Sequence, residues 1–170
     1  MANQVFEAAR TVLAVREYQE KRLPADVARR VVEAAHLTAS ASNVQAWHFV
    51  LVRERDALRK IGSLMRSAPY VANAAAAVVV AYEKKASTGV SDCSRAIQSM
   101  ILTAWGEGVA SNMSGFGGLE GVRKECGIPD TYEVFAVVPL GYPARPILGK
   151  KKRKPLNEVV SAERFGRPLA

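Results

Sequence analysis

The spacing of apolar residues along the chain predicts helices that alternate with a few short strands. Apolar positions three and four residues apart predict amphipathic helices over residues 3–14, 24–37, 58–68, 91–108, 119–126 and 156–163. Runs of β-branched and other apolar residues predict strands over 48–52, 74–82, 109–113 and 133–140. This pattern indicates an α+β layered fold in which helices surround a small central mixed or antiparallel sheet.

Local signals set some of the expected boundaries. Ser91 is predicted to cap the start of the long helix, Gly106 to close it, and Pro69 to end the third helix. The run 74–82 has no polar alternation, so it is expected to be a strand covered on both faces. The 170 residues contain no internal repeat and no domain-scale linker, which predicts a single domain over 1–170.

The composition is that of a soluble protein. No apolar run is long enough to span a bilayer, so no membrane partner is expected. The first residues do not form a basic and then apolar leader. Cys93 and Cys126 have no metal-binding spacing, and they are expected to be reduced core thiols. Together these features predict a cytoplasmic location.

The net charge of +8 suits an anionic partner, which could be a nucleic acid, an acidic surface or a phosphorylated small molecule. The densest basic run is 150–154, where lysines flank Arg153 and offer a phosphate both a bidentate fork and point charges. The same run could be a solvated or nucleic-acid-binding cluster. Aromatic residues make up only 7% and do not alternate with basic residues as stacking platforms would, which argues against nucleic acid.

The stretch from Ser40 to Trp47 has the most unusual local chemistry. It holds two hydroxyls, two carboxamides and an indole, and it carries no charge. Carboxamides have both hydrogen-bond donors and acceptors, so they can bind the edge of a flat heterocycle that carries both kinds of group. The alternative is a polar connection between helix and strand.

Several chemistries find no support. The chain has only two histidines, His36 and His48, and neither has the spacing of a metal site or a nucleophile–base pair. The glycine-rich segment 115–118 is not a dinucleotide fingerprint, although glycine lets backbone N–H groups approach a ligand closely. A flexible turn is the alternative for that segment. No catalytic side chain and no metal site are therefore predicted.

Taken in order, these segments resemble the nitroreductase superfamily of FMN-dependent oxidoreductases. The most specific match is 39–47, which is similar to the family's Pro-Ser-x-x-Asn-x-Gln-Pro-Trp motif. Weaker matches are 15–18, 113–116 and 138–143. Residues 151–153 match the Lys-x-Arg near the C-terminal end of the family's sequences, which binds the FMN phosphate. The resemblance implies an oxidoreductase that passes hydride or electrons from NADH or NADPH, through bound FMN, to a nitroaromatic, quinone or similar small-molecule acceptor.

The resemblance also implies which residues hold the cofactor. Lys151 and Arg153 would bind the phosphate, and Arg16 would bond the phosphate, the ribityl chain or the ring edge. The remaining candidates lie in two loops: Ser40, Ser42, Asn43 and Gln45 in the first, and the backbone of Ser114 and Gly115, near the flavin N5, in the second. The flavin carries the chemistry. Family members are usually homodimers with flavin at the interface, which makes helices 3–14 and 91–108 the expected dimer surfaces.

The chain departs from the family pattern at the phosphate end. Val12 and Ala14 stand where the family has an arginine and a serine, and Ala39 and Ala46 replace two prolines. A hydrogen bond to a charged group is worth about 1.5–3 kcal/mol, so weaker FMN retention is expected. The alternative function is therefore a flavin-binding protein of the same fold with weak or no NAD(P)H turnover.

Overall fold

A computed structural model describes residues 3–115 and 117–169, and within them a sheet with the strand order β1-β2-β4-β3 forms the middle layer. The strands are β1 (Trp47–Val52), β2 (Ala76–Glu83), β3 (Ala110–Ser111) and β4 (Tyr132–Gly141). Each neighbouring pair is antiparallel. The expected α+β class and antiparallel sheet are confirmed.

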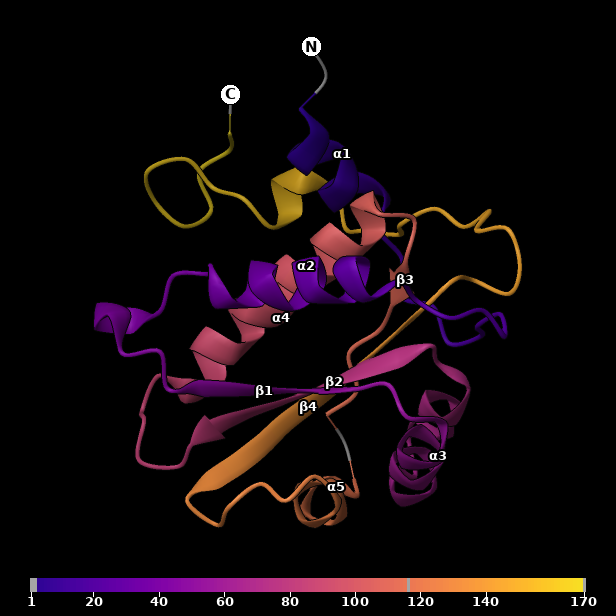
Figure 1. Ribbon diagram of the computed structural model, residues 1–170. Helices are drawn as coiled ribbons and strands as arrows, with labels where there is room; N and C mark the ends of the chain where they lie inside the picture. The colour runs from indigo at the N-terminus through magenta and orange to yellow at the C-terminus, as the bar shows by residue number, and fades with distance from the viewer. Residues whose placement is uncertain (1–2, 116, 170) are drawn as a thin grey trace.

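Helices cover both faces of this sheet, as Figure 1 shows. One face carries α2 (Ala25–His36) and α4 (Gly89–Gly106), and the other carries α3 (Arg55–Leu64) and α5 (Leu119–Glu125). Successive side chains of a strand point to opposite faces. In β2, Val78 and Val80 accordingly pack with α2 and α4, whereas Val79 packs with α3 and α5. The expectation of a strand covered on both faces is confirmed.

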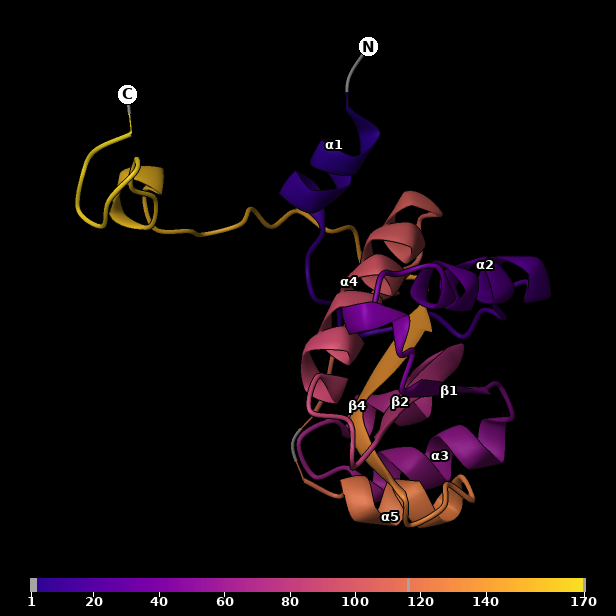
Figure 2. The same cartoon turned by 90° about the vertical axis from the view of Figure 1, so that its left-hand side faces the viewer.

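Two segments lie outside these layers, at the same side of the molecule (Figure 2). Helix α1 (Gln4–Thr11) has no buried residue. Residues 144–169, called the C-terminal arm below, run away from the sheet and contain one short 3-10 turn, Leu156–Glu158. The indole of Trp105 donates to the Thr11 hydroxyl at 2.9 Å, which joins α1 to α4.

The first helix is shorter than the predicted 3–14. It ends at Thr11, and the backbone beyond it is extended because β3 offers hydrogen-bonding partners there. Ala14 pairs with Ser111 in a parallel bridge, and the Val15 amide donates to the Ser111 carbonyl at 3.0 Å. Further on, Tyr18 pairs with Pro143. The chain after α1 thus extends the sheet at its β3 edge.

Three other boundaries differ from the predictions. Helix α4 begins at Gly89, so Ser91 lies inside it and donates its hydroxyl to the Thr88 carbonyl instead of capping the end. Helix α3 ends at Leu64, and Pro69 begins a separate 3-10 helix. The predicted helix 156–163 is wrong beyond its first turn, since short helices depend on packing and this segment has no buried residue.

Among residues 3–115 and 117–169, no helix is both long and apolar enough to cross a membrane. Cys93 is a buried free thiol, and burial raises its pKa to about 12; Cys126 is free and half-buried. Trp47 is buried and stacks on Phe49, with ring centroids 5.9 Å apart, as expected for a core residue.

Candidate functional site

A cavity of about 280 Å³ lies where the chain after α1, helix α4, strand β3 and the C-terminal arm come together. It is lined by Val12, Leu13, Ala14, Gln98, Ile101, Ser111, Asn112, Met113, Lys151 and Arg153. Small-molecule sites usually measure about 300–1,000 Å³, so this cavity is large enough for one end of a cofactor. We call it the arm cavity.

The arm cavity suits an anion. Its charged lining residues are Lys151 and Arg153, and none of the lining residues is acidic. The Lys151 ammonium donates to the Ala9 carbonyl near the end of α1, which leaves further N–H donors of the same group. Arg153 is exposed and forms no ion pair with any residue that the structure describes. The Lys-x-Arg pair predicted from the sequence therefore lies beside Val12 and Ala14, the two positions where the chain departs from the family.

Ser111 is the most unusual polar group of this cavity. Its residue is 3% exposed, and its Oγ has no hydrogen-bond partner among the residues that the structure describes. A buried hydroxyl without a partner costs about 1–3 kcal/mol. A cavity lined by two cations and by a residue with an orphaned hydroxyl fits a ligand that carries anionic or hydroxyl oxygens, as FMN does at its phosphate and ribityl end.

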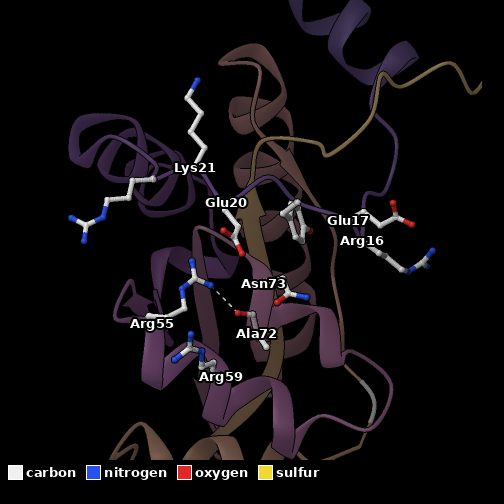
Figure 3. A pocket seen from close by; sticks show the side chains of 10 residues that line it. Arg16, Glu17, Glu20, Lys21, Arg55, Arg59, Ala72 and Asn73 are labelled. Atoms are coloured by element: carbon white, nitrogen blue, oxygen red, sulfur yellow. Dashed lines mark hydrogen bonds between the residues drawn. The ribbon is translucent and has the colours of Figure 1, made fainter.

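Arg16 follows the extended segment that lines the arm cavity. It does not line that cavity; it lines a larger, open hollow of about 630 Å³ together with residues of α3. Figure 3 shows that Arg16 points away from Arg55 and Arg59, and that Lys21 points in yet another direction. Arg55 is engaged with the Ala72 carbonyl at 2.8 Å. The cations of this hollow do not converge on one point, so we do not assign it a ligand.

The stretch 40–45 forms a folded loop whose polar groups face outward. Ser42, Asn43 and Gln45 have φ values of 49°, 55° and 55°, a left-handed conformation that is uncommon outside glycine. The Ser40 hydroxyl accepts from the Gln45 amide at 3.0 Å, and the Gln45 side chain donates to the Asn43 side-chain oxygen at 3.1 Å. Ser42, Asn43 and Gln45 are exposed, while Ala46 and Trp47 are buried. The loop is shaped by its own hydrogen bonds and presents carboxamides to the outside.

Asp92, in the first turns of α4, anchors this loop, and the sequence motifs did not identify it. Its carboxylate accepts from the Ala41 amide at 3.2 Å and from the Thr88 hydroxyl at 2.9 Å, and it pairs with Arg95. Burial opposes ionisation of this side chain. The hydrogen bonds from Thr88 and Ala41 and the charge of Arg95 outweigh that effect and lower the pKa of Asp92.

The loop and the arm cavity lie at different places along α4. The loop is tied to Asp92, whereas the cavity is lined by Gln98 and Ile101. With a rise of 1.5 Å per residue, the two lie roughly 9–14 Å apart along the helix axis. In Figure 1 the purple turn Ala41–Asn43 lies toward one end of α4 and β3 lies toward the other. One chain therefore presents two groups of candidate residues that do not meet.

Both backbone polar groups of Ser114 form hydrogen bonds with Val137 of β4. Its amide donates to the Val137 carbonyl at 3.0 Å, and its carbonyl accepts from the Val137 amide at 2.8 Å. In the part of the chain that the structure describes, no group accepts from the Gly115 amide. Of these two predicted residues, Gly115 therefore retains a backbone donor for a ligand.

Two glycines of the glycine-rich segment have backbone conformations that favour glycine. Gly117 and Gly118 have φ values of 69° and 80°. A Cβ on Gly118 would lie 1.9 Å from the Leu64 carbonyl oxygen. These glycines allow the chain to turn tightly against α3 before α5 begins. Phe116, within the same segment, lies outside the described residues.

Sequence reasoning missed Ser111 and Asp92 because neither belongs to a motif. Ser111 was part of a predicted strand, and Asp92 was an ordinary residue in a predicted helix. Each becomes significant through a partner far away in the chain, Ala14 for the first and Ala41 for the second. In residues 3–115 and 117–169, no group of three or more His, Cys, Asp or Glu side chains could hold a metal ion.

Comparisons with known proteins bear on the family and the fold. The model of the nitroreductase family matches residues 9–89 and 64–142. A protein of Methanothermobacter thermautotrophicus with the provisional name NADH dehydrogenase/NAD(P)H nitroreductase is 34% identical over 148 residues, which cover 82% of this chain and 78% of that protein.

Solved structures share the fold. A protein of Bacteroides thetaiotaomicron with the same provisional name superposes with a TM-score of 0.89 and 23% identity, covering 97% of this chain and 100% of that one. An FMN-dependent nitroreductase of Clostridium difficile gives a TM-score of 0.85 and 19% identity, covering 94% and 99%. At these identities the superpositions establish the fold.

Proposed function

The chain belongs to the nitroreductase family of oxidoreductases, and from this premise we propose that it is an FMN-dependent NAD(P)H oxidoreductase that reduces a nitroaromatic, quinone or similar small molecule. The arm cavity carries the proposal, because it combines Lys151, Arg153 and an orphaned Ser111 hydroxyl without any acidic lining residue. These are the groups that a phosphorylated cofactor requires.

The residues present would hold the cofactor from its phosphate end. Lys151 and Arg153 would bind the phosphate, with Arg153 free to use its planar fork. Neither Arg16 nor Gly115 lines the arm cavity. Both would contact the ring beyond the phosphate end, where a cation near the pyrimidine edge favours the reduced anionic flavin. Bound FMN supplies the hydride and electron transfer, which is consistent with the absence of a nucleophile–base pair from the lining of the arm cavity.

We also propose that the working form is a homodimer with each flavin site built from both chains. The Ser40–Gln45 loop is exposed and lies away from the arm cavity of its own chain. Helix α1 exposes Val5 and Phe6, and the arm exposes Leu148 and Phe165. Apolar surface of this kind is typical of an interface. A partner chain would bring Ser40, Ser42, Asn43 and Gln45 to the open side of the cavity.

The test is the spectrum of the purified protein and its response to a reductant. We expect flavin absorbance as isolated, or saturable uptake of FMN by the apoprotein, followed by bleaching when NADH or NADPH is added without oxygen. A protein that takes up no FMN at micromolar concentrations would contradict the proposal.

A second candidate function is flavin binding without turnover. Val12 and Ala14 support it, because both line the arm cavity with apolar side chains at positions where the family has polar ones. Bound FMN that neither NADH nor NADPH reduces under anaerobic conditions would favour this function over the first.

A further inference from the structure

Ser111 is the bridge partner of Ala14, one of the two positions where the chain departs from the family pattern. Ala14, which occupies the position of the family's serine, is bridged directly to Ser111, and both line the arm cavity. The hydroxyl absent from residue 14 thus has a counterpart on the neighbouring strand.

The backbone holds Ser111 in place from both sides. The Ser111 carbonyl accepts a hydrogen bond from the Val15 amide at 3.0 Å. On its other side, Ser111 is the antiparallel pairing partner of Leu140 in β4. A serine fixed on two sides can move its hydroxyl only by rotating about one bond. The residue lines the arm cavity, and its Oγ is buried and without a partner among the described residues.

We propose that Ser111 is a cofactor-positioning residue whose hydroxyl donates a hydrogen bond to an oxygen at the phosphate and ribityl end of FMN, in compensation for Val12 and Ala14. This inference rests on the proposed function. It deepens that function by assigning a binding role to a residue outside the sequence motifs. A hydroxyl that lacks a protein partner is available to a ligand at no loss of an existing bond.

The experiment compares Ser111→Ala with the matched control Ser63→Ala. The Ser63 hydroxyl donates to the Lys60 carbonyl of its own helix, on the opposite face of the sheet. We expect Ser111→Ala to weaken FMN binding by roughly tenfold, measured by quenching of flavin fluorescence, and Ser63→Ala to leave the affinity unchanged. Ser111→Thr keeps the hydroxyl and should retain most of the affinity.

The thermal stability of the apoprotein gives a second readout. Because the hydroxyl has no protein partner, Ser111→Ala should leave the melting temperature of the apoprotein unchanged or raise it, while reducing the increase that FMN causes. A fall in apoprotein stability with unchanged FMN affinity would show that the hydroxyl is merely structural, and the inference would be overturned.

Riboflavin has the ribityl chain of FMN but no phosphate, so its binding shows which of these two groups accepts the hydrogen bond from Ser111. If Ser111→Ala weakens FMN and riboflavin equally, the ribityl chain is the acceptor; if it weakens FMN alone, the phosphate is. Equal affinities of the wild type and Ser111→Ala for FMN would overturn this inference and leave the proposed function standing. A wild-type protein that binds no FMN would overturn both.

Discussion

The Ala41 amide donates a hydrogen bond to the Asp92 carboxylate over 3.2 Å, and through it the polar loop 40–45 is attached to the first turns of α4. Asp92 is 1% exposed, although the loop that it supports faces outward. Three residues of that loop have positive φ, a conformation that persists only where surrounding contacts impose it. Asp92 thus helps to hold the carboxamides in a defined arrangement before any ligand arrives.

Replacing Asp92 by alanine should loosen the loop and destabilise the fold. The Ala41 amide and the Thr88 hydroxyl would each lose an acceptor, and the expected loss in the free energy of unfolding is about 1–3 kcal/mol. Denaturant unfolding measures the loss, and amide hydrogen exchange should accelerate at Ala41. The control is Asp56→Ala, because the Asp56 side chain is 96% exposed and its ion-pair partner among the described residues is the exposed Arg59. Equal effects of the two substitutions would contradict the anchoring role.

The contribution of Asp92 should depend on pH. Its pKa is lower in the folded protein than in the unfolded chain, so the unfolded state binds the proton more readily. The stabilisation is therefore fully present above the unfolded carboxyl pKa of about 3.9 and is lost as the pH falls through the lower folded value. The stability difference between wild type and Asp92→Asn should be constant near neutral pH and should shrink below about pH 4. A difference that grew on acidification would have the wrong sign.

Arg153→Ala should weaken FMN binding by about tenfold, because a charge-assisted bond to phosphate is lost. Lys154→Ala removes the same charge from the same basic run, but Lys154 does not line the arm cavity. Titration of both variants at one ionic strength separates a specific contact from general attraction. If both lose affinity equally, the phosphate is held by overall charge and not by Arg153.

Phe6→Glu should dissociate the proposed homodimer and lower FMN affinity together. Phe6 is 62% exposed on α1, a helix with no buried residue in the single chain, so a charge there would not disturb the core. Light scattering coupled to size exclusion reports the mass, and the control is Leu51→Glu on β1, where the residue is 36% exposed. A monomeric variant with unchanged FMN affinity would show that one chain suffices for the site.

Gly118→Ala should destabilise the protein by roughly 3 kcal/mol, since it combines a positive φ of 80° with a Cβ 1.9 Å from the Leu64 carbonyl oxygen. Gly106→Ala is the matched control, because a Cβ there meets nothing within 4 Å and alanine favours a helix. Thermal unfolding compares the two variants. A tolerated Gly118→Ala would show that the close approach of Gly118 to Leu64 does not restrict this position.

Much of the layered fold could be read from periodicity, because a helix or a strand repeats its buried face at short intervals. The buried stripe of α4 and the unbroken apolar run of β2 are local patterns, and both elements form as expected. The ends of the helices were less predictable from the sequence. Thr11 ends α1 because β3 pairs with the chain after it, and the arm lacks a helix over 159–163 because no packing surface covers it.

The sequence by itself determined the order of the motifs and the chemistry they carry: carboxamides at 43 and 45, and a lysine and an arginine at 151 and 153. Only the tertiary structure decided that Ser111 lies beside Ala14, that Asp92 supports Ala41, and that the loop 40–45 lies apart from the arm cavity. The physical reason is that local patterns record which face of an element is buried. The partner of each residue depends on how those faces pack across the whole chain.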